Sequence, residues 1–185
     1  MGNPLDQIIV IDLEATCWEG DPPPDQEKEI IEIGLCLLDV ASGMRGEHTS
    51  IVVRPERSTV SAYCTELTTL TQEEVEAGVS FAEACRLLRE QYGARRRVWA
   101  SFGDYDRQQF ERQCRSQQVV YPFGTRHINV KTLVSLVHRL PEEVELPRAL
   151  ELAGLRLEGH HHRGVDDAWN IAALLAEALW PGQPH

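Results

Sequence analysis

The chain of 185 residues is 42% hydrophobic and 25% charged, which is typical of a folded globular protein and excludes collagen-like, disordered and low-complexity chains. Its length predicts a single domain over residues 1–185. With 29 acidic residues against 18 Lys and Arg, the formal net charge of −11 argues against broad, non-specific binding of nucleic acid, because affinity for a phosphate backbone comes largely from clustered basic side chains.

The sequence lacks the marks of membrane insertion and export. No apolar run approaches the roughly 20 residues that span a bilayer, and the N-terminal sequence has neither the basic flank nor the apolar core of a signal peptide. The five cysteines are widely spaced and form no C-x-x-C pair. We therefore expect a cytoplasmic protein with reduced, mostly buried thiols and no membrane partner.

The first third of the sequence predicts a meander of three strands. The continuous apolar run Ile8–Ile11 suits a central strand that is covered on both faces. Ser-Gly turn chemistry separates the second strand from the third, and a proline-rich exposed loop separates the first from the second. The strands are predicted at 7–14, 29–39 and 49–54, the loop at 20–25 and the turn at 41–46.

The rest of the sequence predicts helices with one more strand among them. Thr71–Glu74 has the pattern of an N-cap and first helical turn, and Ser80 is placed to cap the next helix. Strands interleaved with helices indicate an α/β domain. Helices are predicted at 71–78, 81–92, 107–117, 130–140, 146–155 and 167–180, and the strand at 98–102.

Acidic residues and histidines stand at three element ends. Asp12 and Glu14 lie two residues apart at the end of an apolar strand, so their side chains point to the same face. Burial of two unpaired carboxylates is costly. Either the pair has a function, or the strand has already left the core at this point and the two acids are solvated. Asp104 and Asp106 lie where a strand leads into a helix, a place where polar residues also serve as N-caps. The third group, His160–His162 with Asp166 and Asp167, precedes the last helix; the histidines could equally form a solvated loop or an adventitious metal-binding patch.

In chain order these groups resemble the DEDDh branch of the 3′-to-5′ exonucleases, which is named for four acids and a histidine. Six further separated motifs extend the resemblance over nearly the whole chain: Ile11–Cys17, Glu29–Gly34, Arg54–Glu56, Leu67-Thr68 with Thr71-Gln72, Gly103–Asp106, and Gly164–Asp167 with Asn170. These motifs are most similar to those of the ERI-type exoribonucleases, which trim histone-messenger and ribosomal RNA ends and degrade small interfering RNAs.

The resemblance assigns roles where spacing alone leaves alternatives. It implies that Asp106 is the third acid, with Asp104 a neighbour, and that Asp167 is the fourth, five residues after His162. Asp166 is then expected to cap the helix. The other two histidines of the run remain possible substitutes for His162.

Four clustered carboxylates repel one another, and bound cations reverse the local sign of charge. Oxygen ligands suit Mg²⁺ or Mn²⁺, and the family's two-metal mechanism implies two such ions held by Asp12, Glu14, Asp106 and Asp167. His162 is implied as the general base that takes a proton from the attacking water.

Contacts to the 3′ end of the substrate are expected to combine base stacking with phosphate binding. Trp18, Tyr105 and Phe123 are candidate stacking platforms, although each could equally serve packing. Among the basic residues, Arg163 is the strongest candidate phosphate contact, because it adjoins His162.

The resemblance implies a ribonuclease-H-like α/β fold with a mixed five-stranded sheet and helices on both faces. It implies a divalent-metal-dependent 3′-to-5′ exoribonuclease that releases nucleoside 5′-monophosphates from single-stranded 3′ ends or short oligonucleotides. Two alternatives stay open. One is a DNA or dual-specificity exonuclease, because the sequence does not reveal contacts to a 2′-hydroxyl. The other is a non-catalytic nucleic-acid-binding or adaptor module, against which the retention of all five residues argues.

Overall fold

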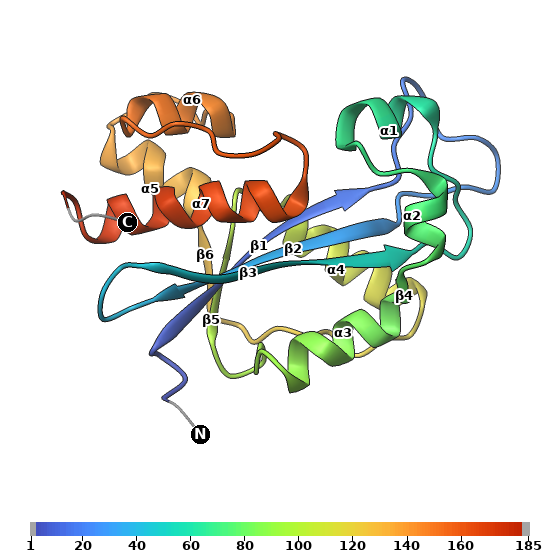
Figure 1. The fold of residues 1–185 in the computed structure, drawn as a ribbon, viewed down its shortest axis with the longest axis horizontal. Coiled ribbons are helices and arrows are strands. Elements are labelled where there is room, and N and C mark those ends of the chain that lie inside the picture. The colour runs from blue at the N-terminus through green and yellow to red at the C-terminus, as the bar shows by residue number, and fades with distance from the viewer. Residues whose placement is uncertain (1–2, 183–185) are drawn as a thin grey trace.

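The computed structural model describes residues 3–182 as a mixed β-sheet with helices on both faces (Figure 1). The sheet order is β4-β3-β2-β1-β5-β6. The strands are β1 (Gln7–Ala15), β2 (Ile30–Asp39), β3 (Arg45–Arg54), β4 (Val79–Ser80), β5 (Val98–Ser101) and β6 (His127–Asn129). The helices are α1 (Ala62–Thr68), α2 (Gln72–Glu76), α3 (Phe81–Glu90), α4 (Tyr105–Ser116), α5 (Val130–Val137), α6 (Leu146–Leu152) and α7 (Gly164–Leu179).

Strand β1 lies at the centre of the sheet, antiparallel to β2 and parallel to β5. Because successive side chains of a strand point to opposite faces, its apolar run supplies two cores. Ile8 and Val10 pack with α5, α6 and α7 on one face, whereas Ile9, Ile11 and Leu13 pack with α3 and α4 on the other. The even-numbered side chains of β1 therefore face α7, and Asp12 and Glu14 continue that series.

The predicted α/β fold, the meander and the helices on both faces are confirmed, but the sheet has six strands and not five. Strands β4 and β6, of two and three residues, are too short to show an alternating pattern. Strand β3 begins at Arg45, earlier than predicted, because Arg45 pairs with Leu38 of β2. Helix α1 was also missed. Its buried Cys64 packs with Ile31 of β2 and with residues around α2.

The predicted caps and thiols are also observed. Thr71 and Glu74 form a reciprocal capping box at α2, and the side chain of Ser80 accepts a hydrogen bond from the backbone of Glu83 in α3. All five cysteines are free thiols, and four of them are buried. Within residues 3–182, no helix is both long and apolar enough to cross a membrane.

Two glycines bring α7 against the sheet. A Cβ atom on Gly34 of β2 would lie 1.9 Å from the backbone of Gly164, which is too close for any side chain. Gly164 in turn lies against the backbone of Asp12. The two backbones approach this closely because Gly34 has no side chain, whereas a Cβ atom on Gly164 would be tight, with its nearest neighbour at 3.1 Å. This contact sets the first turn of α7 beside the end of β1.

Candidate functional site

Residues from β1, α4, α7 and the loop before α7 line one cleft of about 310 Å³ at the end of the sheet. The four predicted acids and two of the three histidines are among them. The lining residues are Asp12, Leu13, Glu14, Ala15, Cys17, Lys28, Leu67, Phe102, Tyr105, Asp106, Glu145, Leu146, His161, His162 and Asp167.

Three of the acids form a compact oxygen cluster. Carboxylate oxygens of Asp12, Glu14 and Asp167 lie within 4.8 Å of one another. The fourth acid, Asp106, lines the same cleft but does not belong to this cluster, and its Oδ1 accepts a hydrogen bond of 3.0 Å from the backbone N–H of Leu13. The contact ties the first turn of α4 to β1 and holds the Asp106 carboxylate beside the other three.

The pKa of every one of these four acids is raised, chiefly because burial disfavours the charged carboxylate. Glu14 has its pKa raised to about 9 by burial and by the neighbouring charges of Asp167 and Glu32. For Asp106, burial raises the pKa to about 7, although hydrogen bonds to its carboxylate act in the opposite direction. A buried all-oxygen cluster that resists ionisation on its own fits a site for hard divalent cations, which would stabilise the charged carboxylates.

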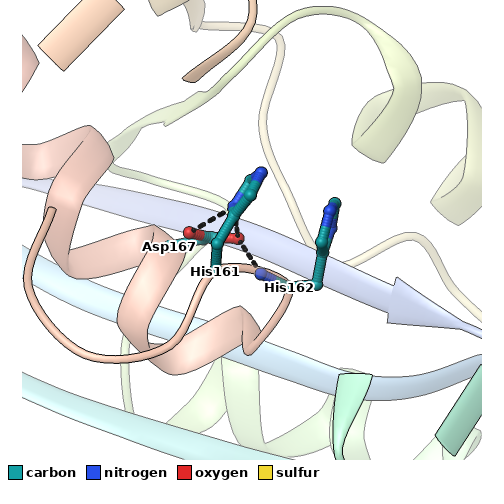
Figure 2. A group of neighbouring side chains, drawn as sticks. All are labelled: His161, His162 and Asp167. Atoms are coloured by element: carbon teal, nitrogen blue, oxygen red, sulfur yellow. Dashed lines mark hydrogen bonds and ion pairs between the residues drawn. The ribbon is translucent and has the colours of Figure 1, made fainter. Parts of the chain in front are cut away.

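The histidine run turns two rings into the cleft (Figure 2). His161 places Nδ1 3.0 Å from Oδ2 of Asp167, and the backbone N–H of His162 donates to the same oxygen at 2.8 Å. The two imidazoles stack with their centroids 3.9 Å apart. Burial lowers the pKa of His162, the charge of the neighbouring His161 lowers it further, and both favour the neutral imidazole. His160 is exposed and outside the cleft, with its Nδ1 against the carbonyl oxygen of His161.

The loop that carries the histidines is fixed to α7. The carboxylate of Asp166 accepts a hydrogen bond of 2.8 Å from the backbone N–H of His160, and Asn170 exchanges hydrogen bonds with the backbone of Glu158. The prediction that Asp166 caps the helix is wrong. Helix α7 begins at Gly164, so Asp166 lies within its first turn and binds the loop from there.

The structure does not place Arg163 in the cleft. Its guanidinium contacts Glu32 at 3.3 Å and donates to the hydroxyl of Thr69 at 3.1 Å. Glu32 is fully buried and also accepts the backbone N–H of Gly164 at 2.9 Å. Arg163 thus helps to hold the start of α7 on β2, and its expected role as a phosphate contact has no support in this geometry.

The three candidate stacking residues have different surroundings. Tyr105 lines the cleft and is 45% exposed. Phe123 is buried and stacks on Trp99 with centroids 4.3 Å apart, so of its two alternatives the structure supports packing in the core and not base stacking. Trp18 is half-buried and is not among the residues that line the cleft.

Sequence reasoning missed Lys28, the one lysine or arginine among the residues that line the cleft. Its ammonium lies 5.8 Å from the ring centroid of Tyr105. Gln109 of α4 donates to the backbone carbonyl of Lys28 at 2.9 Å and so holds this position against the helix that carries Tyr105. Lys28 stands between two glutamates in an irregular segment, and no motif or periodicity marked it out.

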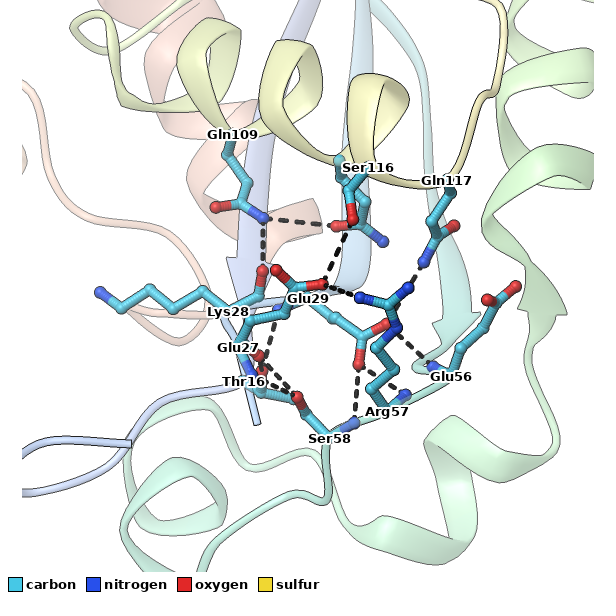
Figure 3. A network of polar contacts seen from close by, with 11 residues as sticks. Thr16, Glu27, Lys28, Glu29, Glu56, Arg57, Ser58, Gln109, Ser116 and Gln117 are labelled. Atoms are coloured by element: carbon cyan, nitrogen blue, oxygen red, sulfur yellow. Dashed lines mark hydrogen bonds and ion pairs between the residues drawn. The ribbon is translucent and has the colours of Figure 1, made fainter. Parts of the chain in front are cut away.

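Glu29, the neighbour of Lys28, anchors the loop that follows β3 (Figure 3). Its buried carboxylate accepts backbone N–H groups from Glu56, Arg57 and Ser58 at 3.0, 2.9 and 2.7 Å. The backbone N–H of Glu29 donates to the hydroxyl of Thr16, just after β1. Glu29 thus joins three segments behind the cleft: its carboxylate binds the β3–α1 loop, and its backbone N–H binds Thr16 at the end of β1, just before β2 begins.

Glu29→Gln should lower the free energy of unfolding by about 2 kcal/mol, because hydrogen bonds to a charged acceptor are stronger than those to a neutral amide. Glu27→Gln is the matched control. Glu27 pairs with Arg57 at the surface, where such a pair contributes about 0–1 kcal/mol. Urea denaturation of both variants measures the difference, and equal stability of the two would contradict the anchoring role of Glu29.

Comparisons with known proteins agree with this geometry. Residues 9–175 match the family model described as Exonuclease (RNase_T). Human 3′-5′ exoribonuclease 1 is 31% identical over 96% of this chain and 53% of that protein, and the Drosophila melanogaster 3′-5′ exonuclease Snipper is 28% identical over 97% and 72%. This chain therefore spans about half the length of the human relative.

A solved structure shares the whole fold. The nuclease domain of 3′hExo, described as a DEDDh family member bound to rAMP, superposes with a TM-score of 0.87 at 29% identity, over 96% of this chain and 94% of that one. The family match extends through every element that contributes to the cleft, from β1 to α7. Sequence and structure together show that this chain belongs to the exonuclease family that includes the DEDDh nucleases.

Proposed function

We propose that residues 1–185 act as a single exonuclease domain, a divalent-metal-dependent 3′-to-5′ exoribonuclease that releases nucleoside 5′-monophosphates from single-stranded RNA ends or short oligonucleotides. The observation that carries the proposal is the cluster of Asp12, Glu14 and Asp167 oxygens, with His162 in the same cleft. The relative named an exoribonuclease and the similar domain bound to rAMP favour RNA over DNA as the substrate.

Divalent metal ions are general to the DEDDh exonuclease family, and the donor set of this cleft fits them. Asp12, Glu14 and Asp167 would hold one ion, and Asp12 with Asp106 the second. All-carboxylate ligation favours Mg²⁺ or Mn²⁺. Such ions, when bound, supply Lewis-acid stabilisation of the attacking water and of the departing 3′ oxygen.

His162 would take the proton from the water that attacks the terminal phosphorus. A general base must be neutral to accept a proton, and the lowered pKa of His162 keeps its imidazole neutral at pH 7. The bond from phosphorus to the 3′ oxygen of the penultimate nucleotide breaks, so the phosphate stays on the released nucleotide as a 5′-monophosphate. Asp167, which accepts the backbone N–H of His162, positions the loop for this step.

Tyr105 and Lys28 would hold the 3′ end of the substrate. The partly exposed ring of Tyr105 can stack on any base, which suits an enzyme that removes nucleotides irrespective of sequence. Lys28, beside that ring, is placed to contact a phosphate. One lysine in a chain of net charge −11 gives the cleft little electrostatic hold on long RNA.

His162→Ala should lower kcat by about 10²–10⁴-fold, the usual contribution of a general base, while the affinity for Mn²⁺ is retained. His160→Ala is the matched control, because His160 lies outside the cleft. Single-turnover cleavage and Mn²⁺ titration of both variants test the assignment. A His162→Ala enzyme with the wild-type rate from pH 6 to 8 would contradict it.

Product analysis tests the proposed function against its alternatives. Uniformly labelled RNA should yield nucleoside 5′-monophosphates, and a DNA oligonucleotide of the same sequence should be cleaved more slowly. Equal or faster cleavage of DNA would favour a DNA or dual-specificity exonuclease. Binding of either polymer with metal present and no product would favour a non-catalytic module.

A further inference from the structure

The cleft contains a second group of metal-binding side chains that overlaps the carboxylate cluster. His161, His162 and Asp167 offer two imidazole nitrogens and one carboxylate oxygen, all within 4.8 Å of one another. The proposed hydrolysis uses one of these imidazoles and gives His161 no part. A mixed nitrogen and oxygen donor set also differs in kind from the oxygen cluster of Asp12, Glu14 and Asp167.

The backbone brings the two rings together. Adjacent residues of an extended chain direct their side chains to opposite sides. His162 has a φ of +67°, in the left-handed region that non-glycine residues rarely adopt, and the rings of His161 and His162 lie side by side at an interplanar angle of 25°. Figure 2 shows both imidazoles rising from the loop on the same side, next to the carboxylate of Asp167.

Existing contacts hold the three side chains in this arrangement. Nδ1 of His161 lies 3.0 and 3.2 Å from the two carboxylate oxygens of Asp167, close to the separation of about 3.4 Å between neighbouring ligands of a tetrahedral zinc ion. Asp167 is 3% exposed, and its Oδ2 is further fixed by the backbone N–H of His162. The ligand atoms are thus gathered before any ion binds.

We propose that His161, His162 and Asp167 form an inhibitory site for a late transition-metal dication, with Zn²⁺ as its representative. Two imidazoles and one carboxylate are a donor set that Zn²⁺ accepts in tetrahedral geometry with one open position, whereas Mg²⁺ prefers six oxygen ligands. An ion bound here is coordinated by the imidazole nitrogen of His162, which then has no lone pair to accept a proton from water. It also takes one carboxylate oxygen of Asp167 from the oxygen cluster. Zinc binding and catalysis are therefore mutually exclusive.

The inhibitory consequence rests on the proposed exonuclease function, but the binding of the ion does not. Co²⁺ separates the two, because in a tetrahedral nitrogen and oxygen site it gives intense visible absorption and in an all-oxygen octahedral site only weak bands. The intact chain should bind one Co²⁺ with intense absorption, and one equivalent of Zn²⁺ should abolish the signal. This readout needs no RNA and no Mg²⁺.

Three variants separate this site from its surroundings. His161→Asn should remove the intense absorption and weaken Zn²⁺ binding at least about tenfold. Asp12→Asn, which disrupts only the oxygen cluster, should retain both, as should His160→Asn, whose ring lies outside the cleft. Circular dichroism and thermal melting verify that each variant is folded before titration.

Inhibition is then measured as the Zn²⁺ concentration that halves each protein's own zinc-free rate in saturating Mg²⁺. This concentration should rise at least about tenfold in His161→Asn and stay unchanged in His160→Asn. Equal Zn²⁺ affinity of wild type and His161→Asn, or weak octahedral absorption of the wild-type Co²⁺ complex, would overturn the proposal. A chain that shows the Co²⁺ and Zn²⁺ behaviour but does not cleave RNA would retain the metal site and refute only the exonuclease function.

Discussion

Asp12→Asn should abolish exonuclease activity, with a fall in kcat of at least about 10³-fold, while making the metal-free protein more stable. Asp12 is the acid that would contact both ions, so its loss removes about 4 kcal/mol or more of transition-state stabilisation. Burial, and then the charges of Asp106, Glu14 and Asp167, raise the pKa of Asp12, so its ionised form is unfavourable in the folded state. A neutral amide of the same shape relieves this repulsion.

The gain in stability should be about 2 kcal/mol at pH 8 without metal, and it should vanish at pH 4, where the carboxyl is already protonated. Asp104→Asn is the matched control, because Asp104 is exposed and pairs with Arg107 outside the cleft. Steady-state kinetics and urea denaturation measure the two effects. An Asp12→Asn protein that is inactive but also less stable would show that Asp12 has a structural role. An active one would refute the metal site.

The free energy of unfolding should depend on pH when divalent ions are absent. Without divalent ions, the folded protein should lose stability as the pH rises through the interval from 4.5 to about 9 over which Glu14 titrates. Because the folded state keeps protons that the unfolded chain has already released, the free energy of unfolding falls with rising pH. The raised pKa of Asp106, about 7, acts in the same direction.

One pKa unit corresponds to about 1.4 kcal/mol, so the total loss should reach at least about 3 kcal/mol. Mg²⁺ or Mn²⁺ should restore stability most strongly at high pH, where the carboxylates are ionised and ready to bind. Melting curves in chelator and in metal from pH 5 to 9 test this, with Glu14→Gln as the variant in which the pH dependence should flatten. Metal-free stability that rises with pH would contradict the raised pKa values of Glu14 and Asp106.

The sequence allowed half of this site to be derived from pattern alone. Asp12 and Glu14 follow an apolar strand at a spacing of two, so a shared face and a cost of burial could be deduced without the fold. Asp106 and Asp167 required the family resemblance, because each lies beside another aspartate and spacing does not choose between them. The structure places Asp106 and Asp167 in the cleft, and Asp104 and Asp166 in contacts outside it.

Other features depended on contacts that no local pattern records. Arg163 adjoins His162 in sequence, but the buried carboxylate of Glu32 draws its side chain away from the cleft. Lys28 reaches the cleft because Gln109, far along the chain, binds its backbone. Helix α7 begins at Gly164 and not at the predicted Asp167, and its first turn lies against Gly34 of β2. This contact joins residues of two different elements, so the sequence of neither element alone predicts it.

A time course of cleavage tests metal-dependent 3′-to-5′ exonuclease activity directly. Wild type and Asp12→Asn are incubated with RNA labelled at its 5′ end, with Mg²⁺ or Mn²⁺ and with chelator. We expect a ladder that shortens one nucleotide at a time from the 3′ end, only with metal and only for wild type. Internal cuts, a ladder that persists in chelator, or no shortening of any RNA by a folded, metal-bound protein would contradict it.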